Sequence, residues 1–209
     1  MNILICDDHK IVRDGLKQIL AQYNDAFLID EAANGREVFD LFNKVAYELL
    51  LLDISLPDQS GLDILQEVKK KWPKTYVLML SMHPQEQYAI RALAHGASGY
   101  LTKDTAAEEL LLAVTEIKKN GKYISQSLAH CLAFQLNNDN NNLALHEKLS
   151  DREFEIMIRI ADGKSLKEIG NELCISGKTV STYRSRIMEK MQLEKNTDLA
   201  RYCIEYQLI

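Results

Sequence analysis

Five short apolar runs, each followed by a longer amphipathic segment, constrain the fold of residues 1–120 more than any other feature of this sequence. The runs have the length and composition of buried strands and occupy residues 2–6, 27–33, 48–53, 75–81 and 98–102. The segments that follow them place apolar side chains at helical spacing. Strands that alternate with helices form a parallel sheet covered on both faces. The sequence therefore predicts an α/β domain with a (βα)5 doubly wound parallel sheet.

Polar residues stand at the carboxyl ends of four of these predicted strands. Asp7 and Asp8 follow the first strand, Asp53 ends the third, Ser81 ends the fourth, and the fifth runs into Lys103. Because the ligand site of a doubly wound fold lies at this edge of the sheet, we expect these side chains to converge there. Three carboxylates in one place repel one another unless a cation intervenes. Oxygen ligands of this kind suit Mg²⁺ rather than a transition metal.

This combination of groups indicates phosphoryl chemistry on an aspartate. A divalent cation with a lysine opposite it stabilises a phosphoryl group during transfer, and an aspartate there can act as the nucleophile. Taken alone, Asp8 could be a helix cap and Lys103 a surface residue. Their occurrence together with the other groups, in the order that the fold requires, favours a site. Pro57 and Gly61 further predict a tight loop after Asp53 that lets the backbone come close.

Residues 1–120 resemble the receiver domain of two-component response regulators. The matching segments are residues 6–9, 52–61, 80–81 and 96–103. The resemblance implies that a histidine kinase, or a donor similar to acetyl phosphate, phosphorylates Asp53. It also implies that the chain is not a multiple-turnover enzyme, although the domain would catalyse its own phosphorylation and dephosphorylation.

A Mg²⁺ site is a second implication of this resemblance. Asp8, Asp53 and the Ser55 carbonyl would ligate the ion directly, and Asp7 would act mainly through water. Phosphatases of the haloacid dehalogenase type also combine an aspartate nucleophile with Mg²⁺, but they need a second acid two residues on, where this chain has Ser55. A dinucleotide-binding domain is disfavoured because no GxGxxG follows the first strand. A receiver that serves as a protein-docking module without phosphorylation stays open as the alternative.

The resemblance also assigns a switch. Ser81 would bond a phosphoryl oxygen, Lys103 would pair with the phosphoryl group, and Tyr100 would rotate inward as the switch aromatic. The family's usual Lys-Pro step is Lys103-Asp104 here, so a cis-proline after the lysine is absent. The family's commoner threonine is Ser81 here, which keeps the hydroxyl that makes the bond.

Charge is spread unevenly along the chain, whose net charge is −5. Residues 1–123 carry a net charge of −4, residues 124–146 carry only Asp139, and residues 147–209 are neutral. Residues 135–142 contain an asparagine run that is too polar to bury apolar area, which is typical of a linker. We therefore predict a receiver domain at residues 1–120, a linker at 121–146 that is partly helical and then Asn-rich, and a second domain at 147–209.

The second predicted domain is small and all-α, with four helix signatures. Ser150 and Ser165 each begin a capping box that opens a helix. Residues 174–176 form a turn, Ser176 caps a third helix that runs to about Met191, and Asn196 caps a fourth. A short helix, a three-residue turn and a longer helix are the signature of a helix-turn-helix.

The third predicted helix divides into two faces. Val180, Tyr183, Ile187 and Met191 form an apolar stripe that we expect to be buried. Residues 176–191 carry a local net charge of +3, which could be an ordinary solvated surface. Small hydroxyl residues among arginines favour a groove-reading helix instead, with arginines on phosphates and short side chains at base edges. The predicted DNA-binding residues are Lys178, Thr179, Ser181, Thr182, Arg184, Ser185 and Arg186.

This half of the chain resembles the LuxR-type helix-turn-helix of the NarL/FixJ response regulators. The resemblance is carried by residues 149–153, 163, 167–169 and 175–191. It implies a phosphorylation-switched transcription factor that binds double-stranded promoter DNA and forms a homodimer on phosphorylation or on DNA, with RNA polymerase as a further partner. Ser181 stands where a lysine is usual and Tyr183 where a histidine is usual, and both departures bear on which DNA sequence is bound.

No stretch of the sequence reaches the ~18 uninterrupted apolar residues of a membrane-spanning helix. The first eight residues lack the basic region of a secretory signal. The four cysteines, Cys6, Cys131, Cys174 and Cys203, form no CxxC pair and lie in apolar-periodic segments, so we expect reduced core residues. These features predict a cytoplasmic protein.

Overall fold

The computed structural model describes residues 1–23, 27–82, 85–126, 128–129, 132, 144–206 and 208–209. The chain folds into two compact units, Met1–Gln135 and Leu136–Ile209. The asparagine run of the predicted linker and Cys131 lie outside the described residues. Within the described ranges, no helix has the length and apolar character needed to cross a membrane.

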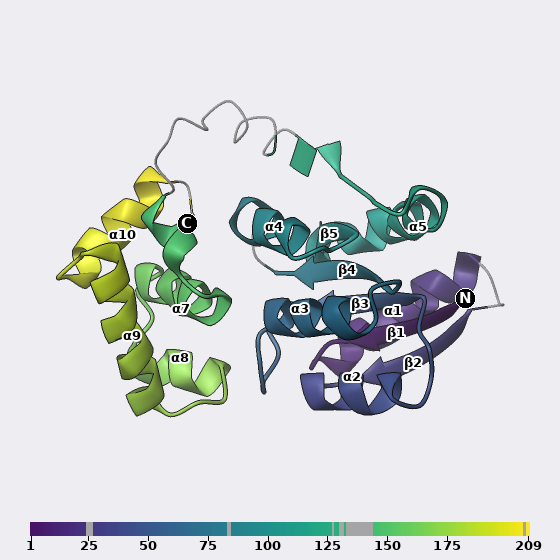
Figure 1. Ribbon diagram of the computed structural model, residues 1–209, viewed down its shortest axis with the longest axis horizontal. Helices are drawn as coiled ribbons and strands as arrows, with labels where there is room; N and C mark the ends of the chain where they lie inside the picture. The colour runs from purple at the N-terminus through teal and green to yellow at the C-terminus, as the bar shows by residue number, and fades with distance from the viewer. Residues whose placement is uncertain (24–26, 83–84, 127, 130–131, 133–143, 207) are drawn as a thin grey trace. The chain divides into compact units, whose positions relative to one another are not determined.

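The first unit is built on a parallel sheet with the strand order β2-β1-β3-β4-β5, five strands in the described ranges (Figure 1). The strands are β1 (Asn2–Cys6), β2 (Leu28–Ala32), β3 (Leu49–Asp53), β4 (Tyr76–Ser81) and β5 (Gly99–Thr102). The helices that follow them are α1 (Lys10–Tyr23), α2 (Gly35–Phe42), α3 (Gly61–Lys71), α4 (Gln85–Ala94) and α5 (Lys103–Asn120). This arrangement confirms the predicted doubly wound α/β fold.

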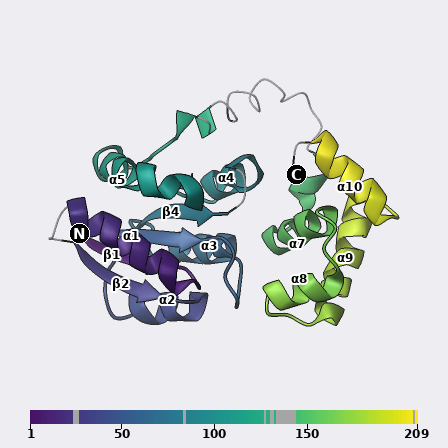
Figure 2. The same ribbon diagram turned by 180° about the vertical axis from the view of Figure 1, so that it is seen from behind.

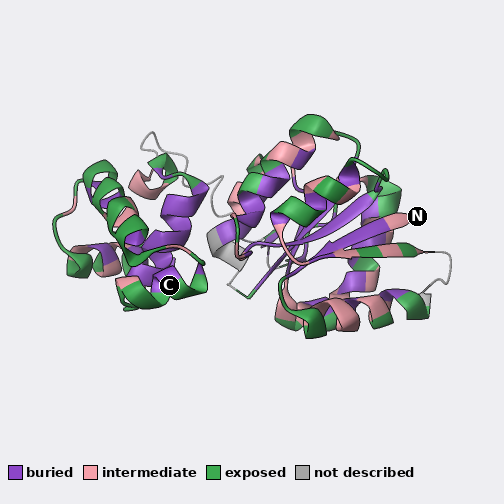
Figure 3. Cartoon of the chain, turned by 90° about the horizontal axis from the view of Figure 1, so that it is seen from below, coloured by how far each residue is buried: buried purple, intermediate pink, exposed green. Residues whose placement is uncertain are grey.

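Both faces of the sheet are covered by helices, as the two opposite views show (Figures 1 and 2). Strand side chains alternate between the faces, and Ile3 and Leu51 join Leu110 of α5 in one core. Leu4 and Leu50, which point to the other face, are also fully buried. Strands β1, β3, β4 and β5 are accordingly buried along most of their length, whereas the edge strand β2 is largely accessible (Figure 3). This burial leaves the strand ends as the place where polar side chains gather.

The second unit contains, among its described residues, a short 3₁₀-helix and four α-helices. Their bounds are η1 (Leu145–Lys148), α7 (Asp151–Ala161), α8 (Leu166–Glu172), α9 (Gly177–Met191) and α10 (Asn196–Glu205). Ser150 and Ser165 make the two predicted capping boxes, and Ser176 accepts from the backbone N–H of Thr179 at the start of α9. The prediction for α10 was wrong in detail, because Lys195 is its N-cap residue and makes no side-chain capping bond.

The turn between α8 and α9 is tight. Cys174 adopts a positive φ of 50°, and a Cβ on Gly170 would lie 2.7 Å from the carbonyl oxygen of Ile175. Glycine therefore allows α8 to approach the turn closely. Cys6 and Cys203 are buried as expected, but Cys174 is exposed because it stands in this turn rather than in a packed helix face.

Candidate functional site

Lys103 brings two buried acids together at the carboxyl edge of the sheet. Its ammonium lies 2.8 Å from Asp53 Oδ2 and 2.6 Å from Asp7 Oδ2. Asp7 is fully buried and Asp53 is 3% exposed. Asp53 is the last residue of β3, Asp7 follows β1, and Lys103 is the first residue of α5. Three residues that the sequence placed at different strand ends are thus in direct contact.

The electrostatics of this cluster are dominated by burial. Burial, together with the neighbouring charge of Asp7, outweighs the opposing Lys103 ammonium and raises the pKa of Asp53 to about 6. Burial lowers the pKa of Lys103, but the two carboxylates outweigh that effect and hold its pKa above the usual value. Two acids therefore compete for one ammonium group, and a second cation would relieve their repulsion.

Asp8 and His9 extend the cluster toward the surface. His9 Nδ1 lies 2.7 Å from Asp8 Oδ1 and 3.4 Å from Asp7 Oδ1. The candidate ligand atoms of Asp7, Asp8 and His9 all lie within 4.8 Å of one another, close enough to share one metal ion. The sequence reasoning gave His9 no role, although its position directly after two acids was a signal for one.

Tyr100 already lies inside the molecule. Its side chain is fully buried, and its hydroxyl is hydrogen-bonded to Ser81, which is 1% exposed. Burial raises the pKa of Tyr100 above the usual value, with the Asp53 charge adding to the effect. This is the inward position that the family resemblance implied for a switched state.

The loop between β3 and α3 is held closely against Asp53. The backbone N–H of Ser55 is hydrogen-bonded to the Asp53 carboxylate. A Cβ on Gly61 would lie 2.1 Å from the Asp53 carbonyl oxygen, so this approach requires glycine. Asp58 accepts two 3.0 Å hydrogen bonds from the first backbone N–H groups of α2, which ties the loop to that helix. The predicted tight loop is confirmed.

The exposed side of α9 carries a hollow of about 360 Å³, lined by Ser176, Lys178, Thr179, Thr182, Tyr183 and Arg186. Four of these six residues, namely Lys178, Thr179, Thr182 and Arg186, were predicted to contact DNA. Ser181 and Ser185 are also exposed. The Thr182 hydroxyl donates to the Lys178 carbonyl at 3.1 Å, and the Ser185 hydroxyl donates to the Ser181 carbonyl at 3.1 Å. Their oxygens keep lone pairs that can accept from an outside donor.

Two expectations for α9 need correction. Tyr183 is half-buried and lines the hollow, whereas Met188 takes a buried place beside Val180, Ile187 and Met191. The buried stripe of α9 is therefore rotated slightly about the helix axis relative to the predicted stripe. The Arg184 guanidinium also donates to the Asn196 side-chain oxygen at 2.8 Å, so this arginine is partly engaged within the domain.

Both halves of the chain match family models. Residues 3–115 match the response regulator receiver domain, and residues 147–203 match the bacterial regulatory proteins of the luxR family. The whole chain is similar to the oxygen regulatory protein NreC of Staphylococcus aureus. The two are 34% identical over 215 residues in strain JH9, covering 100% of this chain and 99% of the relative. Identity is 35% with the protein of strain bovine RF122.

Solved structures resemble all or part of this chain. RcsB from Salmonella enterica serovar Typhimurium, bound to promoter P1flhDC with the phosphomimetic BeF3⁻, matches with a TM-score of 0.62 and 25% identity over 97% of each chain. A two-component response regulator of the LuxR family from Aurantimonas sp. SI85-9A1 matches with a TM-score of 0.60 and 27% identity. That match covers 65% of this chain and 97% of the other.

The sheet topology, the helix-turn-helix and these matches define a DNA-binding signalling protein with a receiver domain. The chain belongs to the two-component response regulators with a LuxR-type DNA-binding domain, the NarL/FixJ type. Such a protein is not a classical enzyme, and its receiver domain is phosphorylated on an aspartate.

Proposed function

We propose that this chain is a transcription factor switched by phosphorylation of Asp53 from a histidine kinase. The contact of Lys103 with both Asp53 and Asp7 carries the proposal, because it sets an ammonium group beside the carboxylate that would be modified. A carboxylate oxygen of Asp53 attacks the donor's phosphorus, and the bond from phosphorus to the donor breaks with its electron pair leaving on the donor. Lys103 then pairs with the transferred phosphoryl group.

Mg²⁺ is the proposed cofactor of this step. Asp8, Asp53 and the Ser55 carbonyl are the proposed direct ligands, and Asp7 would act through water. Carboxylate oxygens are the ligands that Mg²⁺ prefers, and the ligand atoms of Asp7 and Asp8 lie close enough to hold one ion. When bound, the ion supplies positive charge that offsets the phosphoryl oxygens. His9 lies against both acids.

Ser81 and Tyr100 are the proposed switch. The Ser81 hydroxyl would donate to a phosphoryl oxygen, and Tyr100 would stay inward beside it. The surface formed by α4 and β5 would then repack and release or reposition the DNA-binding domain, which residues 121–146 connect to the receiver at 1–120. We place this protein in the cytoplasm.

The recognition helix is proposed to be α9, lying in the major groove of double-stranded promoter DNA. Lys178 and Arg186 would contact phosphates, with Arg184 joining them if it leaves Asn196. The oxygens of Thr179, Ser181, Thr182 and Ser185 would meet base edges. A homodimer would bind two half-sites about one helical turn apart, with RNA polymerase as a further partner. A solved structure of RcsB bound to a promoter supports promoter DNA as the ligand.

Incubation with acetyl phosphate and Mg²⁺, followed by phosphate-affinity electrophoresis, tests the phosphoacceptor. We expect a retarded band that disappears with EDTA and in Asp53→Ala. Asp40→Ala, which removes an exposed acid of α2, is the matched control and should keep the band. Phosphate incorporation at the wild-type level in Asp53→Ala would overturn the assignment.

One observation favours a second candidate function, a receiver that docks a protein without phosphorylation. Tyr100 is inward and bonded to Ser81, the arrangement that such a receiver would keep permanently. In that case wild-type protein would show no retarded band and would still bind its promoter. A promoter affinity that rises on phosphorylation would reject this alternative.

A further inference from the structure

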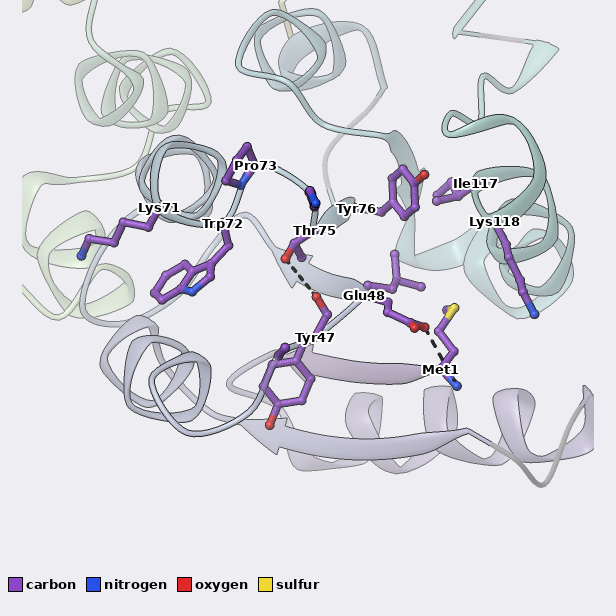
Figure 4. Close-up of a pocket in the computed structure, with 13 residues that line it drawn as sticks. Met1, Tyr47, Glu48, Lys71, Trp72, Pro73, Thr75, Tyr76, Ile117 and Lys118 are labelled. Atoms are coloured by element: carbon purple, nitrogen blue, oxygen red, sulfur yellow. Dashed lines mark hydrogen bonds and ion pairs between the residues drawn. The ribbon is translucent and has the colours of Figure 1, made fainter.

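A second cavity lies at the opposite edge of the sheet from Asp53, where β3 and β4 begin (Figure 4). Its volume is about 670 Å³, and its lining includes Leu49 of β3, Tyr76 of β4 and Ile117 of α5. Pockets that hold small molecules in proteins have volumes of ~300–1,000 Å³. The phosphorylation site and the DNA-binding surface use none of these residues, so the cavity has no role in the function described above.

Aromatic side chains form the walls of this cavity, and their neighbours hold them in place. Trp72 and Tyr47 lie on one side and Tyr76 on the other (Figure 4). The Trp72 ring lies 4.7 Å from the Phe42 ring, and Tyr47 packs edge-on against Phe42 at 5.1 Å. The Tyr47 hydroxyl also donates to Asp30 at 2.6 Å. These contacts preorganise the walls, so a ligand would not have to order them on binding.

The rim of the cavity is positively charged. Lys71, Lys74 and Lys118 stand on it as exposed side chains, and Glu48 is the one acidic residue of the described lining. Lys71 is already paired with Glu67. Lys74 and Lys118 have no ion-pair partner in the part of the chain that the structure describes. Two ammonium groups therefore remain available to an anion from outside.

We propose that this cavity binds a small amphipathic anion, with an apolar chain or ring against the aromatic walls and an acidic head group at Lys74 and Lys118. Contact of the apolar part with Trp72, Tyr76 and the accessible edge of Tyr47 supplies the attraction, because it removes apolar surface from water. The unpaired lysines select a negative charge over a neutral or positive one. The site is separate from Asp53 and does not depend on the function proposed above.

Trp72 makes the test direct, because it is the single tryptophan of the chain. Its fluorescence in the full-length protein is titrated with decanoate and, separately, with decanol, which has the same apolar chain without the charge. We expect a saturable change with both and an affinity for decanoate about tenfold higher, as two exposed ion pairs allow. No saturable change with decanoate, or equal affinity for decanol, would overturn the proposal.

A matched pair of double variants locates the head group. Lys74→Glu with Lys118→Glu reverses the two unpaired charges, and Lys70→Glu with Lys119→Glu makes the same change in net charge at exposed neighbours that do not line the cavity. The first pair should lower decanoate affinity about tenfold and leave decanol affinity unchanged, and the control pair should leave both within about twofold. Equal losses of decanoate affinity in the two pairs would show only a general charge effect and would refute the site.

Thermal unfolding by circular dichroism checks that all variants fold. Lys118→Gln serves as a milder variant, which should also lower the affinity for decanoate and leave that for decanol unchanged.

Discussion

The two units of this protein bury charged side chains in opposite ways. In the C-terminal unit, Glu155 is 1% exposed and meets two guanidinium groups, Arg152 at 2.6 Å and Arg159 at 3.3 Å. Arg159 also pairs with Glu172 at 3.2 Å, and Lys164 lies 2.7 Å from Glu172, so each of the two acids meets two cations. In the receiver domain, two buried acids share the single ammonium of Lys103.

This difference distinguishes ion pairs that stabilise a fold from charged groups that take part in a reaction. The first cluster, which we call balanced because each of its acids meets two cations, ties α7 to α8. The unbalanced cluster, formed by Asp7, Asp53 and Lys103, leaves buried negative charge uncompensated. This charge destabilises the receiver domain but allows the cluster to bind a cation and to accept a phosphoryl group. Removing an acid from the balanced cluster should therefore destabilise the C-terminal unit. Removing a negative charge from the unbalanced cluster should stabilise the receiver domain.

Glu155→Ala should have the largest effect, because it leaves two buried guanidinium groups without their shared acid. We expect the C-terminal unit to lose about 3–5 kcal/mol of unfolding free energy. Urea denaturation followed by circular dichroism measures this loss. Glu189→Ala, which removes an exposed acid of α9, should change it by less than about 0.5 kcal/mol. A loss of under about 1 kcal/mol in Glu155→Ala would mean that the balanced cluster does not hold the fold.

Gly61→Ala should come next, since its Cβ would meet the Asp53 carbonyl oxygen at 2.1 Å. We expect a loss of about 1–3 kcal/mol from the receiver domain, together with slower phosphorylation of Asp53. Trp72 fluorescence reports the unfolding of this domain. Gly15→Ala is the control, because a Cβ there meets nothing within 4 Å and alanine favours helix α1. An equal change in unfolding free energy in Gly61→Ala and Gly15→Ala would contradict a tight loop after Asp53.

Asp53→Asn should stabilise the receiver domain by about 1–2 kcal/mol at pH 7 without Mg²⁺. Burial raises the pKa of Asp53 to about 6, so its ionised form is disfavoured in the folded state. The gain should be full above pH 6 and should shrink as the pH falls toward about 4, where wild-type Asp53 is protonated in the folded protein. Thermal unfolding at several pH values measures it. Added Mg²⁺ should stabilise the wild type more than the variant, and a destabilised variant at pH 7 would contradict the unbalanced cluster.

Arg186→Ala should give the smallest change, in the salt dependence of DNA binding. Loss of one phosphate contact lowers the slope of log K against log salt by ~0.9. Arg184→Ala should lower it less, because Arg184 is engaged by Asn196. Titration of a promoter duplex and a scrambled duplex at several salt concentrations measures both slopes. If Arg184→Ala has the larger effect, the exposed charges of α9 are assigned to the wrong side of the helix.

The sequence was sufficient to predict the receiver fold and the convergence of its strand-end residues. Residues 49–52, four consecutive leucines, are characteristic of a strand buried on both faces. The fold then brings Asp7, Asp53 and Lys103 to one edge. Contacts that depend on side-chain direction could not be predicted in this way. The sequence did not indicate that Tyr100 is already bonded to Ser81, or that His9 contacts both acids.

Helix α9 shows where sequence periodicity loses accuracy. A helical repeat defines a stripe only to within about one residue, so Tyr183 was assigned to the core and Met188 was not. In a domain this small, one neighbouring residue is enough to decide whether a side chain is exposed. The bond from Arg184 to Asn196 joins residues 12 apart in sequence, and nothing in the pattern of either segment indicates it.

Lys103 has a further property that follows from its place as the first residue of α5. The amino end of a helix carries a partial positive charge, so a cation there is disfavoured by about 0.3–1 kcal/mol unless anions offset it. Asp7 and Asp53 supply that offset, and Asp104 adds to it in the same turn. The first turn of α5 is therefore stabilised by the negative charge at Asp53, and its amide hydrogens should exchange with solvent more slowly as that charge increases. The exchange rate of these amide hydrogens would therefore report the charge at Asp53, which lies 50 residues earlier in the chain.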